Sequence, residues 1–176
     1  FPYAIGYGMT ETSPLIAGAP PKKSRFQSTG PKIEGIEVKL INVDPATGIG
    51  EIVTKGPHVM KGYYKNEELT KAAFTEDGFF KTGDCGSMDK DGYLYIKGRN
   101  KNVIVGASGE NIYPEDIEFV LNKHPLVLES LVIERDKKLV ALVKLDEDSI
   151  EKEPASENSE SSPYAKTLDD IRNFVN

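Results

Sequence analysis

The 176-residue sequence contains a single cysteine, Cys85, so no disulfide can form within the chain. The sequence also lacks an excess of basic residues, and its net charge is −6. A general nucleic-acid binder needs positive charge to neutralise phosphates, so this charge balance argues against that class. The lone cysteine agrees with a reducing compartment, and we expect a cytoplasmic protein with no nucleic-acid partner.

No apolar run approaches the length of a membrane-spanning helix. We therefore expect at most peripheral membrane contact, at the inner face. The chain begins FPYAIGYG, without an initiator methionine or a signal segment, and we expect it to be a piece of a longer protein. Apolar residues make up 38% and charged residues 28%, which is typical of a globular protein with a modest core.

The first half of the chain predicts a small, mostly antiparallel β-unit. Residues 1–30 are rich in Gly, Pro, Ser and Thr, which favours loop with little regular structure. Over residues 31–98 alternating apolar positions and Asp-Gly turns predict strands and hairpins. Asn66 precedes EELTKAAF and is placed to cap a short helix.

The second half of the chain predicts another α+β module, joined to the first near residues 99–101. Pro114 suits the first position of a helix that ends near His124. A β-hairpin is expected around the charged turn RDKK, and an acidic loop over residues 151–163. Thr167 is expected to cap a last helix, DDIRNFVN.

Three segments carry residues suited to a polar ligand. In YGMTET, threonine hydroxyls can donate to phosphate, the carboxylate of Glu11 can hold Mg²⁺, and the Tyr7 ring can stack on a base. The structural alternative is a polar loop in which Thr10 or Thr12 caps a helix. Taken alone, this segment favours the alternative.

The other two segments are FKTGDCG and GRNKNVIVGASGENIYPEDIE. Asp84 follows a glycine, and a carboxylate in such a turn can accept both hydroxyls of a ribose. Arg99 and Lys101 are donors at a flexible junction, and Gly106 and Gly109 permit close approach of a ligand to the backbone. The alternatives are a turn at a strand end and a solvated linker before a glycine-rich hairpin.

The order and spacing of YGMTE, KTGD and GRNKNVIV…GENIYPEDIE resemble the adenylate-forming superfamily, specifically its acyl-CoA synthetases. The flank GYGMTETSPLI is most similar to the long-chain fatty acid–CoA ligases. The resemblance covers about Ile5 to Leu145. It implies two steps: ATP and a fatty acid give an acyl-adenylate and pyrophosphate, and coenzyme A then displaces AMP to form a thioester.

The resemblance also implies roles for individual residues. Tyr7 would lie against adenine, with Gly8 beside it in the nucleotide site. Thr10 would bond a phosphate, and Glu11 would bind Mg²⁺. Asp84 and Arg99 would contact the ribose, and Lys101 would be the hinge. Gly109 would lie beside the pantetheine channel.

The resemblance further implies an α+β architecture with two parts. Residues 1–98 would be the end of a large N-terminal domain, including a β-barrel-like part, and residues 99–176 an incomplete mobile C-terminal domain. Two family motifs have no match: the Ser/Thr/Gly-rich phosphate loop and the catalytic lysine in its Pro-x₄-Gly-Lys context. We therefore expect these 176 residues to be inactive alone. Without most of the N-terminal domain, apolar surface of residues 1–30 would be uncovered, and we expect this segment to be disordered or to self-associate with another copy of the chain.

Two other functions stay open at this point. The first is an adenylating ligase for another acid, such as an aryl or medium-chain acid. The second is a non-catalytic module that binds nucleotide or docks a carrier protein. DKDGYLYIKGRN lacks the ligand set of a calcium loop, and we interpret Cys85, His58 and His124 as structural residues.

Overall fold

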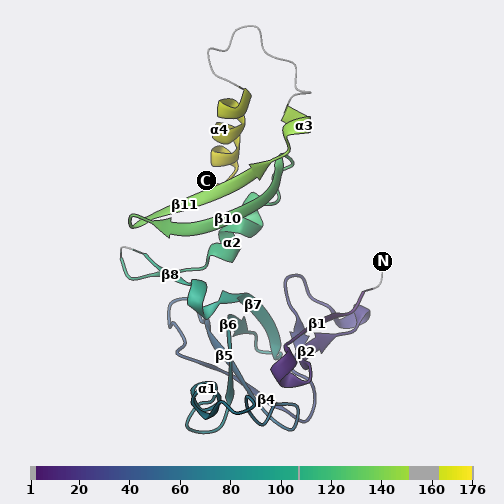
Figure 1. Cartoon of the computed structure of the whole chain (residues 1–176). Helices are drawn as coiled ribbons and strands as arrows, with labels where there is room; N and C mark the ends of the chain where they lie inside the picture. Colours follow the sequence, from purple (N-terminus) through teal and green to yellow (C-terminus); the bar gives the residue numbers. More distant parts are fainter. Residues whose placement is uncertain (1–2, 107, 151–162, 176) are drawn as a thin grey trace. The chain divides into compact units, whose positions relative to one another are not determined.

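A computed structural model describes residues 3–106, 108–150 and 163–175 of the chain. The chain divides into two compact units, residues 1–101 and residues 102–176. Figure 1 gives the order of the elements along the chain. No helix in the described ranges is both long enough and apolar enough to cross a membrane.

The first unit is built on an open five-stranded antiparallel sheet with the order β3-β7-β6-β5-β4. The expected mostly antiparallel β-unit is confirmed, but the expected barrel-like closure is not observed. A barrel requires its first and last strands to pair, whereas β3 and β4 stand at opposite ends of this order in the described part of the chain. The strands are β3 (Gly30–Pro31), β4 (Glu37–Ile41), β5 (Gly50–Lys55), β6 (Phe80–Met88) and β7 (Tyr93–Arg99).

The N-terminal segment is more regular than its composition predicts. Instead of loop, β1 (Ile5–Gly8) and β2 (Leu15–Ala19) form an antiparallel hairpin. Ala17 of β2 is fully buried in a cluster with Ile52 and Leu94 of the main sheet. Small residues let the hairpin approach the sheet closely, so the glycines that suggested a loop serve packing here. The hairpin carries the YGMTE motif.

Short helical turns complete the first unit: η1 (Thr10–Thr12), η2 (Pro21–Lys23) and α1 (Glu67–Ala72). The predicted cap of α1 is confirmed, since the Asn66 side chain accepts a hydrogen bond from the Leu69 amide at 2.9 Å. Leu69 itself is 50% exposed, and α1 buries none of its side chains. A further turn, η3 (Asn100–Asn102), lies at the junction between the units.

The second unit packs helices against a β-hairpin. The predicted hairpin around RDKK is confirmed, and its turn residues Asp136 and Lys137 both have positive φ. Leu121, Val127, Val132 and Ile171 form the core between these elements. The elements are β8 (Ile104–Val105), β9 (Asn111–Ile112), α2 (Pro114–Leu121), β10 (Val127–Arg135), β11 (Lys138–Leu145), α3 (Glu147–Ile150) and α4 (Pro163–Val175).

The predicted start of the last helix is wrong. Thr167 does not cap α4 but lies inside it and is buried, because the helix begins four residues earlier at Pro163. Proline is favoured in the first helical turn, where its missing N–H breaks no bond. Residues 151–162, most of the acidic loop expected from the sequence, lie outside the described residues.

Candidate functional site

Asp84 brings together the three motifs that the sequence separates widely. The Tyr7 hydroxyl donates to Asp84 Oδ2 at 2.7 Å, although the two residues are 77 positions apart in sequence. On the other carboxylate oxygen, Arg99 Nε lies 3.1 Å from Asp84 Oδ1. YGMTE, KTGD and GRN therefore meet at one carboxylate within the first unit.

The backbone around Asp84 explains why the carboxylate is held in place. Gly83, the residue before Asp84 in β6, has φ of +71°. A residue with a side chain would be strained in this backbone conformation, whereas glycine adopts it freely. The Thr82 hydroxyl accepts from the Asp84 amide at 3.1 Å and donates to the Ile52 carbonyl at 2.8 Å. Asp84 and Arg99 are directly opposite in the β6–β7 register, so the sheet itself sets their contact.

The charge and burial of this cluster suit recognition of a sugar diol. Asp84 is 7% exposed, whereas the Arg99 side chain is 52% exposed and lies over it. A carboxylate accepts from hydroxyls and a guanidinium donates to them, so the pair offers both roles to neighbouring hydroxyls. Burial, and then the bond to Asp84, raises the pKa of Tyr7 far above its ordinary range, so this residue remains a neutral donor.

Glu11 lies in the turn between β1 and β2 and is also held by a tyrosine. The Tyr63 hydroxyl donates to Glu11 Oε1 at 3.2 Å, and the Met60 amide donates to the Glu11 carbonyl at 2.8 Å. Beside Glu11, Thr12 is fully buried, and its hydroxyl lies 2.7 Å from the Pro14 carbonyl. The turn is therefore fixed by Thr12 from within and by residues 60–63 from outside.

The donor set at Glu11 fits Mg²⁺ only as a shared ligand. The described residues contain no cluster of three or more His, Cys, Asp or Glu side chains that could enclose a metal. Mg²⁺ is commonly held by one or two carboxylates together with substrate phosphates and water. Glu11 alone therefore fits a metal that arrives with a polyphosphate, and does not fit a metal bound by protein alone.

The other predicted residues of YGMTE differ in their surroundings. Thr10 is exposed, and its carbonyl accepts from the Ser13 amide at 3.3 Å. A Cβ added at Gly8 would lie 1.7 Å from the Pro14 carbonyl oxygen, so backbone packing alone requires glycine there. Packing of the hairpin backbone therefore explains the glycine at position 8 without any ligand.

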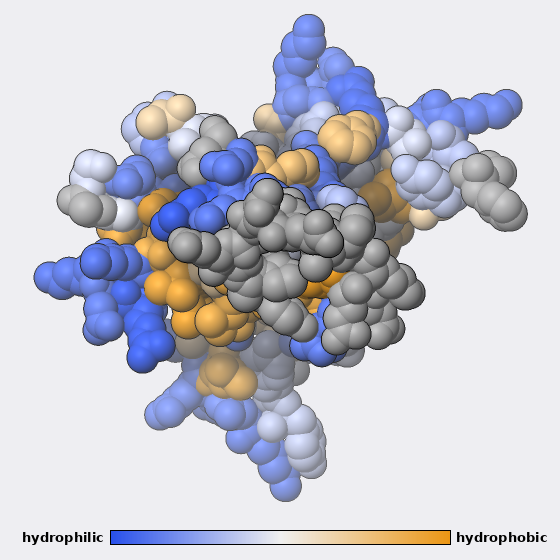
Figure 2. All heavy atoms as spheres, turned by 90° about the horizontal axis from the view of Figure 1, so that it is seen from above, coloured by the Kyte–Doolittle hydropathy of each residue, from blue (hydrophilic) through white to orange (hydrophobic). Residues whose placement is uncertain are grey.

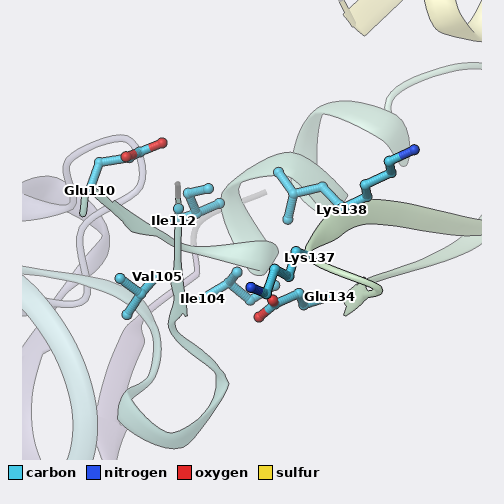
Figure 3. A pocket seen from close by; sticks show the side chains of 9 residues that line it. Ile104, Val105, Glu110, Ile112, Glu134, Lys137 and Lys138 are labelled. Atoms are coloured by element: carbon cyan, nitrogen blue, oxygen red, sulfur yellow. The ribbon is translucent and has the colours of Figure 1, made fainter. Parts of the chain in front are cut away.

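Two further predicted residues, Lys101 and Gly109, belong to different units. Lys101 is the exposed last residue of the first unit. Gly109, in the second unit, has φ of +88° and open space around it. Next to it in sequence, Gly106 and Glu110 line a groove of about 470 Å³ (Figure 3).

The groove has an apolar and a charged part. Ile104 and Ile112 from β8 and β9 line it together with Leu139 of β11. In Figure 3 the side chains of Lys137 and Glu134 lie near each other at the hairpin turn, and Glu110 lies on the other side of the groove. The lining suits a ligand with both apolar and polar atoms.

Sequence reasoning did not identify Tyr63 or Thr82 as parts of the site. Tyr63 stands in GYYKN, where nothing in the local pattern separates it from its exposed neighbour Tyr64. Thr82 directly precedes the Gly-Asp pair, and a short hydroxyl two residues before a turn carboxylate was the available signal.

Comparisons with known proteins give a consistent result. A family model described as AMP-binding enzyme matches residues 2–64. The putative acyl-CoA synthetase YngI of Bacillus subtilis is 44% identical over 139 residues, which cover 73% of this chain and 25% of that protein. The long-chain-fatty-acid–CoA ligase FadD15 of Mycobacterium bovis is 37% identical over 147 residues, covering 83% and 23%. This chain spans about a quarter of the length of these relatives.

Solved structures of o-succinylbenzoate CoA synthetase (MenE) from Bacillus subtilis share the fold. The complex with the acyl-adenylate intermediate OSB-AMP has a TM-score of 0.78 at 34% identity and covers 98% of this chain and 34% of that chain. The complex with ATP and magnesium ion has a TM-score of 0.72 at 39% identity, covering 82% and 31%.

Proposed function

Because this chain belongs to the AMP-binding, adenylate-forming superfamily, we propose that it supplies the adenosine contacts and the hinge of an AMP-forming acid–CoA ligase. The observation that carries the proposal is that Tyr7 and Arg99 both contact the buried carboxylate of Asp84. Three polar groups from distant segments converge there.

In the proposed reaction a carboxylic acid attacks ATP, giving an acyl-adenylate and pyrophosphate. The thiol of coenzyme A then attacks the acyl carbon, releasing AMP and leaving a thioester. Adenylation makes the acid's oxygen a good leaving group, so the protein contributes mainly by positioning and by stabilising charge. Asp84 and Arg99 would hold the ribose, Tyr7 and Gly8 would lie at the adenine, and Thr10 would donate to a phosphate.

Bound Mg²⁺ would neutralise phosphate charge during this reaction, and Glu11 is the residue proposed to share it. Lys101 is proposed as the hinge residue, since it lies at the boundary between the two units. Gly109 is proposed to lie beside the pantetheine arm of coenzyme A. The neighbouring groove with its apolar and charged parts supports that position.

We propose a long-chain fatty acid as the substrate, on the resemblance of GYGMTETSPLI and the match to a long-chain ligase. The match to a succinylbenzoate synthetase keeps other acids as the second candidate. For a fatty-acid substrate we also propose a cytoplasmic location, with peripheral contact at the inner membrane face.

The decisive test is acid-dependent exchange of pyrophosphate into ATP by the full-length gene product, with acids of graded chain length. We expect long-chain acids to support exchange of pyrophosphate into ATP and to give an acyl-adenylate that hydroxylamine traps as a hydroxamate. Exchange with only short or aryl acids contradicts the proposed long-chain substrate. Nucleotide binding without exchange for any acid instead supports a non-catalytic binding module.

The 176 residues by themselves contain no phosphate loop or catalytic lysine of the family pattern, so we propose that they form no thioester alone. Measured thioester formation from ATP and coenzyme A by this chain, above a blank, contradicts that. We also propose that the chain self-associates through apolar surface of residues 1–30, where Tyr3, Leu15 and Phe26 are exposed. Figure 2 shows apolar side chains at the surface among hydrophilic ones. A monomeric mass in light scattering contradicts self-association.

A further inference from the structure

We propose that Tyr63 is a positioning residue for Glu11, which sets the geometry in which this carboxylate shares Mg²⁺ with a nucleotide. The inference rests on the proposed function. It concerns a residue outside the three motifs that led to that function, and its basis is the contact between the Tyr63 hydroxyl and Glu11 Oε1 at 3.2 Å.

The backbone of Tyr63 is held from two sides, so its hydroxyl reaches Glu11 from a fixed position. The Tyr63 amide donates to the Thr70 hydroxyl of α1 at 2.8 Å. The Tyr63 carbonyl accepts from the Asn66 amide at 3.2 Å. Gly62 packs so closely on Thr70 that an added Cβ would lie 2.6 Å from Thr70 Cγ2. Helix α1, which buries no side chain, thus serves to fix the segment that carries Tyr63.

The Glu11 end of the contact is equally constrained. The Glu11 carbonyl accepts from the Met60 amide at 2.8 Å, which joins the segment before Tyr63 to the turn itself. The turn is closed by the buried Thr12 hydroxyl, which accepts from the Met9 amide at 3.1 Å. Both partners therefore approach from rigid backbone, and little conformational freedom is lost when the contact forms.

The contact gives the two oxygens of the Glu11 carboxylate different surroundings. Oε1 receives the Tyr63 hydroxyl, and Oε2 has no hydrogen bond from any residue that the structure describes. Mg²⁺ requires near-octahedral geometry with short bonds, which a carboxylate meets with one oxygen more readily than with two. Holding Oε1 favours that single-oxygen mode and prevents the side chain from turning away from a bound nucleotide.

The test measures ATP binding by the full-length gene product through calorimetry, with Mg²⁺ titrated from zero. Tyr63→Phe removes only the hydroxyl. Tyr64→Phe is the matched control, because Tyr64 is the next residue and is 88% exposed. We expect Tyr63→Phe to need about threefold to tenfold more Mg²⁺ for half-maximal ATP binding, the effect of one modest hydrogen bond. Metal-free ATP affinity should stay unchanged, and Tyr64→Phe should match the wild type.

A second arm uses Glu11→Gln. In that background, adding Tyr63→Phe should cause no further change in the Mg²⁺ requirement, because the two residues act as a unit. The inference is overturned if Tyr63→Phe behaves as Tyr64→Phe does. It is also overturned if ATP affinity falls equally with and without Mg²⁺, which marks a purely structural role. If the wild type itself shows no Mg²⁺-dependent ATP binding, the proposed function fails, and this inference fails with it.

Discussion

At the scale of single residues, two carboxylates of the first unit are each held by a tyrosine hydroxyl. Tyr7 donates to Asp84 and Tyr63 donates to Glu11. A buried carboxylate needs donors to remain stable, and a hydroxyl supplies one without cancelling its charge. Each carboxylate is therefore held in place by a hydroxyl that comes from a distant segment of the first unit.

Removing the Tyr7 hydroxyl should lower stability. Tyr7→Phe leaves the buried Asp84 Oδ2 without its donor, and we expect a loss of about 1–3 kcal/mol at pH 7 in chemical denaturation. The pKa of Tyr7 is raised in the folded state from an ordinary value of 10.0. Its contribution is therefore complete below that value and is lost as the pH rises above it. The gap between variant and wild type should narrow above pH 10. The exposed Tyr3→Phe is the control, and a gap independent of pH contradicts the assignment.

His58 should make the first unit sensitive to acid. Its Nε2 lies 3.1 Å from Thr54 Oγ1, and its buried Nδ1 has no partner among the described residues. Burial lowers the pKa of His58 below its ordinary value of 6.5. The neutral ring's contribution is thus present above pH 6.5 and is lost as the pH falls through the lowered pKa. His58→Gln should reduce the fall in melting temperature between pH 7 and pH 5. An unchanged slope counts against this account.

At the scale of elements, the β1–β2 hairpin carries the YGMTE motif on a backbone that tolerates little change. The Met9 amide donates to the Pro14 carbonyl at 2.8 Å, and the register shifts between Tyr7 and Gly8. This irregularity turns the chain into Thr10–Thr12. The placement of Glu11 therefore depends on the hairpin as a whole.

Gly8→Ala should distort this hairpin. The added Cβ would lie 1.7 Å from the Pro14 carbonyl oxygen, which is backbone and cannot move aside. We expect a loss of at least about 1–3 kcal/mol, as for other overpacked sites, and faster amide exchange in β1 and β2. Gly6→Ala is the matched control, since its Cβ would lie 2.9 Å from the movable Leu15 side chain and no closer than 3.7 Å to the Ala17 carbonyl oxygen. Equal effects of the two changes would contradict this account.

The cap of α1 offers a test of how this helix supports the site. Asn66→Ala removes the acceptor for the Leu69 amide and should cost about 1 kcal/mol of local helix stability. Because Thr70 of α1 bonds Tyr63, we expect faster amide exchange at Tyr63 as well. Asn66→Asp retains a capping oxygen and should behave as the wild type. Faster exchange confined to α1 contradicts the proposed support.

Much of the fold could be predicted from the sequence because the signals were local. Alternating apolar residues and Asp-Gly turns gave the strands, and Asn66 and Pro114 gave two helix starts. The β1–β2 hairpin was missed because it is stabilised by distant partners such as Ile52 and Leu94, which composition does not reveal. The contacts of Tyr63 and Thr82 were missed for the same reason, since each depends on tertiary proximity.

At the scale of the whole molecule, two compact units are joined at Lys101 and Asn102. A hinge needs only a few junction residues that absorb a change in backbone dihedrals. The exposed turn η3 at this junction has the required length and solvent access. If the proposed hinge is correct, the two half-reactions require different backbone conformations at Lys101.

Lys101→Pro should separate the two half-reactions in the full-length gene product. Proline fixes φ near −65° and removes the amide donor, so it restricts the junction to fewer conformations. We expect pyrophosphate exchange to remain within about threefold of wild type while thioester formation falls at least about tenfold. Lys101→Ala keeps the backbone free and is the control. A proline variant that makes thioester at the wild-type rate contradicts the hinge.

The central claim is that Asp84 anchors an adenosine in an adenylating enzyme. It is tested most directly by acid-dependent ATP–pyrophosphate exchange in the full-length gene product carrying Asp84→Asn. Glu76→Gln, the same change at an exposed carboxylate, is the control. The account predicts exchange by the wild type and the control, and a loss of at least about tenfold in kcat/KM for ATP in Asp84→Asn, measured at a temperature at which all three proteins are folded. Equal exchange by all three proteins would contradict it.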